Sequence, residues 1–104
     1  MIKVIAGFKV KRGEDIQALL LKLRSHAMTF RGYIGSENLI ADKDTTIIAV
    51  ANTWENVIDW KDWESSSIAL GIMKEIRKAL VEEPRITVYR IMPTTGWSYA
   101  PRSS

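Results

Sequence analysis

The apolar residues of this chain switch between two spacings along its length, and this alternation is the strongest constraint on its fold. From Ile2 to Val10 they occupy every second position, which is typical of a half-buried β-strand. After Gly13 they recur at intervals of three and four as far as Ala27, which is typical of an amphipathic helix. We expect Glu14 and Asp15 to lie in its first turn, because acidic side chains stabilise helix N-termini.

A pair of strands is predicted next along the chain. Arg31-Gly32 ends the first helix, and Tyr33 to Ala41 has the composition of a strand. Thr45 to Thr53 is predicted to be the returning strand. The intervening Asp42-Lys43-Asp44 is typical of a hairpin turn, so the two strands are expected to be antiparallel.

Two further helices and a last strand complete the order. A short helix is expected over Glu55 to Glu64, where apolar side chains crowd on one side. The serine run at 65–67 offers an N-cap for a longer helix that begins near Ile68 and ends before Pro84. Ile86 to Met92 is rich in β-branched residues and is predicted to be the last strand.

The order βαββαβ predicts the fold class. It is typical of a ferredoxin-like α+β sandwich, in which four antiparallel strands carry the helices on one face. A length of 104 residues leaves room for one core, so we assign residues 1–92 to a single domain. Residues 93–104 are expected to form an irregular extension whose Trp97 and Tyr99 pack against the protein body or a partner.

The third predicted strand is apolar on both faces. Ile47 to Ala51 is an unbroken apolar run, whereas a strand with one solvent-exposed face should alternate apolar and polar residues. Since the helices suffice to cover one face, the simplest cover for the other is the same face of a second copy. We therefore expect a homodimer that forms through the sheet faces.

Composition narrows the classes of function. The chain has no cysteine and a single histidine, His26, so disulfides, thiol nucleophiles and the usual zinc sites are not expected. The net charge of +3 comes from basic residues spread along the chain, which does not indicate a nucleic-acid partner. No apolar run is long enough for a signal peptide or a membrane span, so we expect a cytoplasmic protein that does not bind membranes.

Three segments give the chain a resemblance to a known family. They are the opening strand that runs into Lys11-Arg12-Gly13, the segment Phe30 to Glu37, which is similar to a "PGxxGSE" motif, and Thr53-Trp54 leading into a helix rich in tryptophan. Together they resemble the antibiotic-biosynthesis monooxygenase (ABM) family of dimeric α+β barrels. The likeness covers about residues 2–92 and is more specific for the fold than for the reaction.

The resemblance implies a chemistry that needs no cofactor. Members of the oxygenase branch combine dioxygen with a small aromatic quinol or polycyclic phenol in a pocket between the sheet and the helices. Because the substrate anion supplies the electrons, the protein has to bind a flat ring, help to remove a phenolic proton and exclude water. The alternative is a non-catalytic homodimer of the same fold that binds a small ligand or assembles only with itself.

The candidate site residues are large aromatic and hydrogen-bonding side chains. Trp63 and Asn52 are the candidates for catalytic roles. The candidates for the substrate pocket are Trp54, Trp60, Asn38, Ser36, Tyr33 and Met73. The tryptophans could equally anchor the short helix to the sheet, and the polar residues could satisfy loop backbone groups. His26 is predicted to lie in the last turn of the first helix, where an imidazole interacts favourably with the helix C-terminus.

Two related functions, haem degradation and RNA binding, are disfavoured because the residues that they need are missing. The haem-degrading branch is similar but uses an asparagine, a tryptophan and a histidine, and this chain matches only the tryptophan, at Trp63. The other two positions fall on Ala6 and Met73, and methionine on an apolar stripe is a common gap-filler of cores. An RNA-recognition motif has the same βαββαβ order, but the third strand here carries aliphatic residues where base-stacking aromatics are needed.

Overall fold

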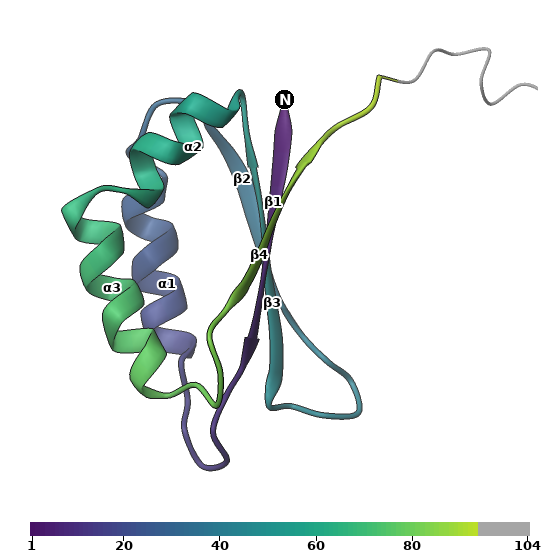
Figure 1. The fold of residues 1–104 in the computed structure, drawn as a ribbon, viewed down its shortest axis with the longest axis vertical. Helices are drawn as coiled ribbons and strands as arrows, with labels where there is room; N and C mark the ends of the chain where they lie inside the picture. Colours follow the sequence, from purple (N-terminus) through teal and green to yellow (C-terminus); the bar gives the residue numbers. More distant parts are fainter. Residues whose placement is uncertain (94–104) are drawn as a thin grey trace, which may run out of the picture.

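A four-stranded antiparallel sheet carries all of the described helices on one of its faces (Figure 1). The computed structural model describes residues 1–93, so the expectation for Trp97 and Tyr99 lies outside the described residues. The elements in chain order are β1 (Ile2–Lys9), α1 (Gln17–Ala27), β2 (Tyr33–Ile40), β3 (Ile47–Trp54), α2 (Val57–Glu64), α3 (Ser67–Lys78) and β4 (Arg85–Arg90). The strand order is β2-β3-β1-β4, which confirms the ferredoxin-like βαββαβ prediction. Within residues 1–93, no helix is long and apolar enough to cross a membrane.

Helix α1 begins later than its sequence pattern suggested. The expectation that Glu14 and Asp15 lie in its first turn is wrong, because the helix starts at Gln17. Asp15 instead lies just before the helix, where its Oδ1 accepts a hydrogen bond from the Gln17 N–H at 2.9 Å. The acid therefore satisfies a free N–H of the first turn from outside it.

The β2–β3 loop is longer than the predicted turn. Asp44 Oδ1 accepts hydrogen bonds from the Thr46 N–H at 3.0 Å and from its Oγ1 hydroxyl at 2.6 Å. These bonds hold Thr45 and Thr46 in the loop, so β3 starts at Ile47 instead of Thr45. The antiparallel pairing of β2 with β3 is as predicted.

Side-chain caps fix both helices of the second crossover. Asn56 caps α2 by accepting the Asp59 N–H at 3.0 Å, and Ser66 caps α3 by accepting the Ala69 N–H at 3.2 Å. The predicted serine cap is therefore confirmed at Ser66. Helix α3 ends at Lys78, well before Pro84, because the chain then turns to pair Leu80 with Val10 of the opening strand segment.

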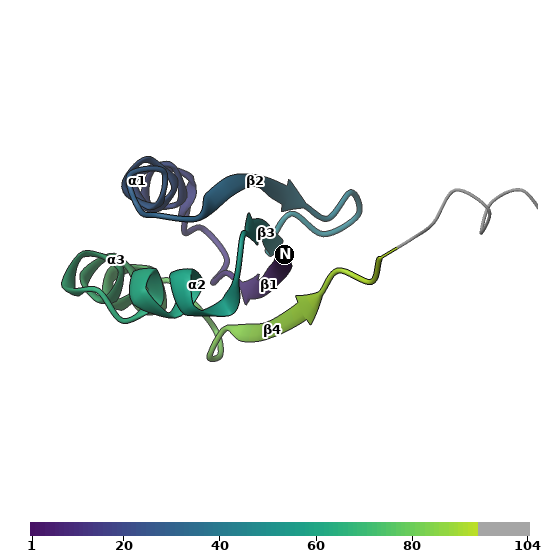
Figure 2. The same cartoon turned by 90° about the horizontal axis from the view of Figure 1, so that it is seen from above.

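The core is divided into two clusters along the sheet. One contains Phe8, Val10, Ile48 and Ile76 at the end of the sheet where α1 begins. The other contains the three buried tryptophans together with Ile2, Val4, Ala27 and Ala69. Seen from above, α1 lies over the β2 side of the sheet and α3 over the β1 side, and the opposite sheet face carries none of the described helices (Figure 2).

Gly32 joins α1 to β2 in a conformation that other residues rarely adopt. Its φ is +84°, and a Cβ at this position would collide with the buried Asp59 carboxylate of α2. We expect Gly32→Ala to lower the free energy of unfolding by about 2–3 kcal/mol, from backbone strain plus the collision. Urea unfolding followed by tryptophan fluorescence measures this change.

The matched control for this substitution is Gly13→Ala. Gly13 has a similar φ of +88°, but no atom lies within 4 Å of the position of its Cβ. We expect the free energy of unfolding of this variant to fall by only about 1 kcal/mol, because backbone strain is then the only cost. Equal losses in the two variants would show that the contact with Asp59 is unimportant.

Candidate functional site

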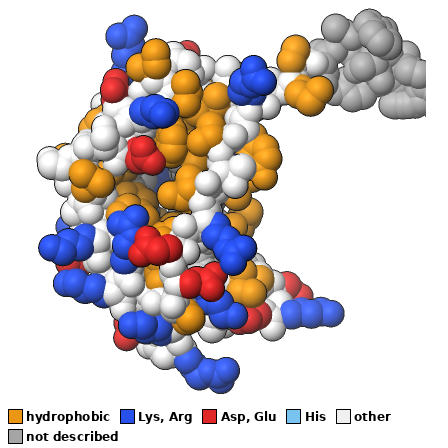
Figure 3. Space-filling view, in the orientation of Figure 1, with side chains coloured by type: hydrophobic (Ala, Val, Ile, Leu, Met, Phe, Trp, Pro, Cys, Tyr) orange, Lys and Arg blue, Asp and Glu red, His pale blue; other side chains and the backbone are white. Residues whose placement is uncertain are grey.

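A cavity of about 310 Å³ lies between the helix-covered face of the sheet and helices α2 and α3. The volume is within the range of small-molecule sites, which starts at roughly 300 Å³. Figure 3 shows the molecule hollowed between the helices and the front strand, with hydrophobic side chains gathered around the opening. The lining is mainly apolar and comes from β1, β3, β4, α1, α2 and α3; its sheet side includes Val4, Ala6, Phe8, Val50 and Ile86, and its helix side Leu23, Ala69, Leu70 and Met73.

Two tryptophans form the aromatic wall of this cavity. Trp60 and Trp63 are spaced three apart on α2, so both point from the helix towards the sheet, and both are buried. The ring of Phe30 meets Trp63 edge-on, with centroids 4.9 Å apart. This contact fixes the plane of the Trp63 indole, which leaves a rigid apolar surface for a flat ligand.

Asn52 is the polar group on the sheet side of the cavity. It is half-buried on β3, and its Oδ1 accepts a hydrogen bond from Trp54 Nε1 at 3.3 Å. Because an indole N–H can only donate, this bond fixes which end of the amide faces Trp54. No acceptor within residues 1–93 takes the Nδ2 hydrogens of Asn52. The amide is therefore an oriented, uncharged donor at the cavity wall.

A smaller chamber continues beyond Asn52 towards β2. Its volume is about 30 Å³, the space of about one water molecule. Asn52 and Trp63 line both spaces, and Ser36, Asn38 and Tyr33 line only the smaller one. The Tyr33 hydroxyl lies 2.8 Å from Ser36 Oγ, so these two side chains already share a hydrogen bond.

The remaining candidate, Trp54, lines neither space. It is completely buried behind Asn52, and its ring meets Tyr33 edge-on with centroids 5.5 Å apart. The structure thus brings seven of the eight sequence candidates to two adjoining spaces and places Trp54 where it orients Asn52.

Three polar or charged residues at the rim were not predicted from the sequence. Glu64 and Ser65 lie at the corner between α2 and α3, and Arg77 lies in the last turn of α3. Arg77 had a detectable signal, since it follows Met73 by four positions and so lies on the same side of the helix. Its Nε donates to Glu83 Oε1 at 3.0 Å, in an ion pair that is largely exposed.

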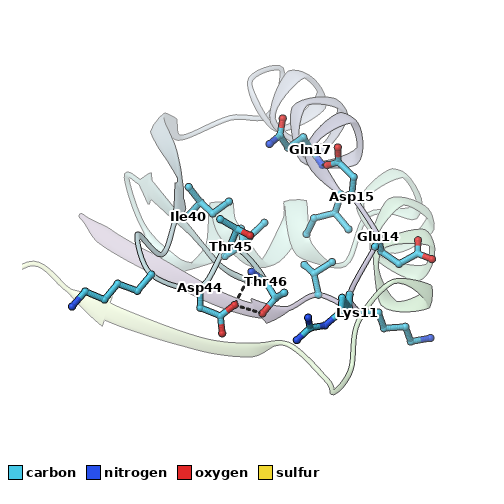
Figure 4. A pocket seen from close by; sticks show the side chains of 14 residues that line it. Lys11, Glu14, Asp15, Gln17, Ile40, Asp44, Thr45 and Thr46 are labelled. Atoms are coloured by element: carbon cyan, nitrogen blue, oxygen red, sulfur yellow. Dashed lines mark hydrogen bonds between the residues drawn. The ribbon is translucent and has the colours of Figure 1, made fainter.

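A larger space at the far end of the sheet has a different character. It measures about 510 Å³ and lies between the β1–α1 loop and the β2–β3 loop (Figure 4). Its lining mixes Lys11, Glu14, Asp15 and Asp44 with threonines and includes no aromatic ring. The hydrogen bonds from Thr46 hold the pKa of Asp44 below its usual value, so this carboxylate stays charged and engaged with the loop. The apolar cavity beside Trp63 is therefore the better ligand site.

Solved structures of other proteins share this architecture. A conserved protein from Methanosarcina mazei Go1 superposes with a TM-score of 0.81 at 19% identity, over 88% of this chain and 92% of that chain. A protein from Nitrosomonas europaea, assigned by name to the antibiotic biosynthesis monooxygenases, gives 0.81 at 14% identity, over 89% and 100%. SnoaB, a cofactor-independent oxygenase from Streptomyces nogalater, gives 0.80 at 9% identity, over 91% and 96%.

The chain has the fold of the antibiotic biosynthesis monooxygenases. No family model and no curated protein matches it by sequence, so the likeness is one of structure. The predicted resemblance to the ABM fold is confirmed at that level.

Arg24 of α1 lines the smaller chamber beside Asn52, whereas His26 and Tyr89, which can also titrate or donate, lie away from the cavity of this ABM fold. His26 is in the last turn of α1 and faces a groove between α1 and α3 on the outer side of the helices. Tyr89 lies on the bare face of the sheet, opposite Lys3 of β1. Neither lines the cavity or the chamber beside Asn52.

Proposed function

We propose that this protein is a cofactor-independent monooxygenase that oxidises a small aromatic quinol or polycyclic phenol in the cavity beside Trp63. The observation that carries the proposal is the pairing of a rigid aromatic wall with one oriented amide donor, Asn52. The shared fold with SnoaB, a cofactor-independent oxygenase, supports the reaction class.

The proposed chemistry asks three things of the site. Trp60 and Trp63 hold the flat ring and exclude water from it. Asn52 donates its Nδ2 hydrogens to the substrate oxygen, which stabilises the phenolate and so lowers the pKa of the bound phenol. The phenolate then supplies the electrons that reduce dioxygen. The ring carbon opposite the phenolate oxygen gains a C–O bond and loses its C–H hydrogen, so that one oxygen atom enters the product as a carbonyl. The other oxygen atom leaves as water, which contains that hydrogen and the phenolic proton.

Oxygen uptake tests this proposal directly. An oxygen electrode should record consumption above the spontaneous rate when the protein is given anthrones or model hydroquinones. We expect Trp63→Phe to lower kcat/KM by about tenfold, because the smaller ring loses contact with the substrate and with Phe30. Ile58→Ala on the exposed side of the same helix is the matched control and should retain full activity, because Ile58 is 68% exposed and lines neither space.

A broad panel with no uptake above the spontaneous rate would contradict the proposal. Binding of the same compounds without uptake would assign the cavity to a non-catalytic ligand-binding protein of the same fold. Calorimetric titration of the unreacted compounds under nitrogen separates these two outcomes.

We also propose that the protein is a homodimer in which the bare sheet faces of two copies pack together. Ile5, Ala49, Ala51 and Leu39 all point to this face, as the pairing register of the strands shows. Leu39 is 50% exposed and Tyr89 on the same face is 51% exposed. An apolar sheet face of this kind is suited to a standard interface, which buries about 800 Å² per partner.

A further inference from the structure

We propose that the cavity selects aromatic ligands that carry an anionic group at one end, and that Arg77 is the residue that binds this group. The inference rests on the proposed function only in taking the cavity as the aromatic site. It concerns specificity, which the fold shared with other proteins does not define.

The sheet side of the cavity has two distinct ends. Asn52 is paired with Val4 on β1, and Phe8 lies four residues further along the same strand. Since a strand rises about 3.3 Å per residue, this lining is about 13 Å long. The cavity therefore fits an elongated ligand, with the amide of Asn52 at one end.

The helix side of the cavity has the same two ends as the sheet side. Ala69, near the start of α3, packs in the tryptophan cluster with Val4. Ile76, near the end of α3, packs in the other cluster with Phe8. Arg77 follows Ile76 directly, so its guanidinium lies at the Phe8 end of the cavity, remote from Asn52.

The charges at the rim of the larger cavity favour one orientation of an anionic ligand, because Arg24, on the Asn52 side, lines only the smaller chamber of about 30 Å³. Glu64 lies at the corner of α2 and α3, on the side of the tryptophan cluster, where it repels an anion. At the other end, Arg77 presents a permanent positive charge whose planar guanidinium matches a carboxylate. A ligand with its oxygen at Asn52 and its carboxylate at Arg77 satisfies both ends.

The present partner of Arg77 is easily exchanged. Its ion pair with Glu83 joins side chains that are 43% and 77% exposed, and such surface pairs contribute little stability. A ligand carboxylate in the partly enclosed cavity is less screened and can replace Glu83. Glu83 thus acts as a weak competitor that holds the guanidinium at the rim until an anion binds.

Calorimetric titration with two matched probes tests the inference without turnover. Anthracene-2-carboxylate and anthracene-2-carboxamide have the same shape and lack a phenolic proton. We expect the protein to bind the carboxylate about tenfold more tightly, and Arg77→Gln to abolish this preference without changing carboxamide binding. Glu83→Gln should tighten carboxylate binding about threefold by removing the competitor.

Lys78→Gln is the matched control for charge. Lys78 is the next residue, is paired with Glu75 and does not line the cavity, so its loss should leave the preference intact. An equal effect of Lys78→Gln, equal binding of the two probes by the unaltered protein, or no binding of either probe would overturn the inference. If carboxylate is preferred through Arg77 but no oxygen is consumed, the proposed reaction is refuted and this inference stands. If oxygen is consumed but carboxylate is not preferred, this inference is refuted and the proposed reaction stands.

Discussion

Replacing Asn52 with leucine is expected to lower kcat for oxygen uptake by about 100-fold, the largest effect of any single substitution in the cavity. In the proposed complex the amide donor faces the oxygen on which negative charge is highest in the phenolate, and loss of one such donor typically costs about 100- to 1,000-fold. Leucine has nearly the shape of asparagine and keeps the wall of the cavity filled. Since the interaction is stronger with the anion than with the neutral phenol, we expect KM to change little. Steady-state oxygen uptake with an anthrone measures both constants.

Trp54→Phe separates the role of the donor from a loss of structure. The Asn52→Leu variant leaves the buried Trp54 N–H without its acceptor, which costs about 1–3 kcal/mol of stability. Trp54→Phe also disturbs this buried contact but retains the Asn52 donor, only less well oriented. We expect it to lose about tenfold in kcat. Equal losses of activity in the two variants, in step with their unfolding midpoints, would show that the site depends on packing and that Asn52 has no chemical role.

The fold could be predicted from the sequence because each element carries its own periodicity. The alternation in β1 and the helical spacing around Leu20 and Ile76 follow from which side chains must be buried, and the structure buries them. The boundaries of the helices and strands were harder to predict from the sequence, since they depend on single side-chain hydrogen bonds. Asp15 and Asp44 each bond a backbone N–H two residues ahead, and either bond could have been replaced by a further turn of helix or a longer strand.

The site was partly predictable for a similar reason. Trp63, Asn52 and Met73 could be assigned to one space because strand and helix periodicity places them on facing surfaces. The position of Trp54 could not be predicted in this way. Trp54 and Asn52 are two residues apart on β3 and so lie on the same face of the sheet, and only the packing of Trp54 against Tyr33 decides which of the two reaches the cavity. Arg77 was overlooked because a charged residue on an amphipathic helix is ordinarily solvated, and its approach to the cavity depends on how far α3 extends over the sheet.

Ala49→Arg is expected to convert the proposed homodimer into an 11.8 kDa monomer at micromolar concentration. Ala49 lies on the bare face of the sheet, in β3 between Gly7 of β1 and Leu39 of β2. A twofold interface repeats each substitution, so one arginine from each copy would enter an apolar contact. Burying these unpaired charges costs several kcal/mol, which corresponds to a weakening of the dimer by at least about 1,000-fold. Sedimentation velocity of the variant and the unaltered protein measures the change.

The same substitution should leave the isolated fold intact, because the side chain of Ala49 points away from the helix-covered core. The same kind of substitution at Ile68 of α3, Ile68→Arg, is the matched control, since Ile68 is also an exposed apolar residue, at 43%, but lies in the groove between α1 and α3 on the outer side of the helices. We expect Ile68→Arg to sediment like the unaltered protein. An unaltered protein that sediments as a monomer, or an Ala49→Arg variant that remains a dimer, would refute the proposed interface. Another partner would then have to bury the apolar run from Ile47 to Ala51, because apolar side chains on a solvent-exposed strand face do not stabilise the fold.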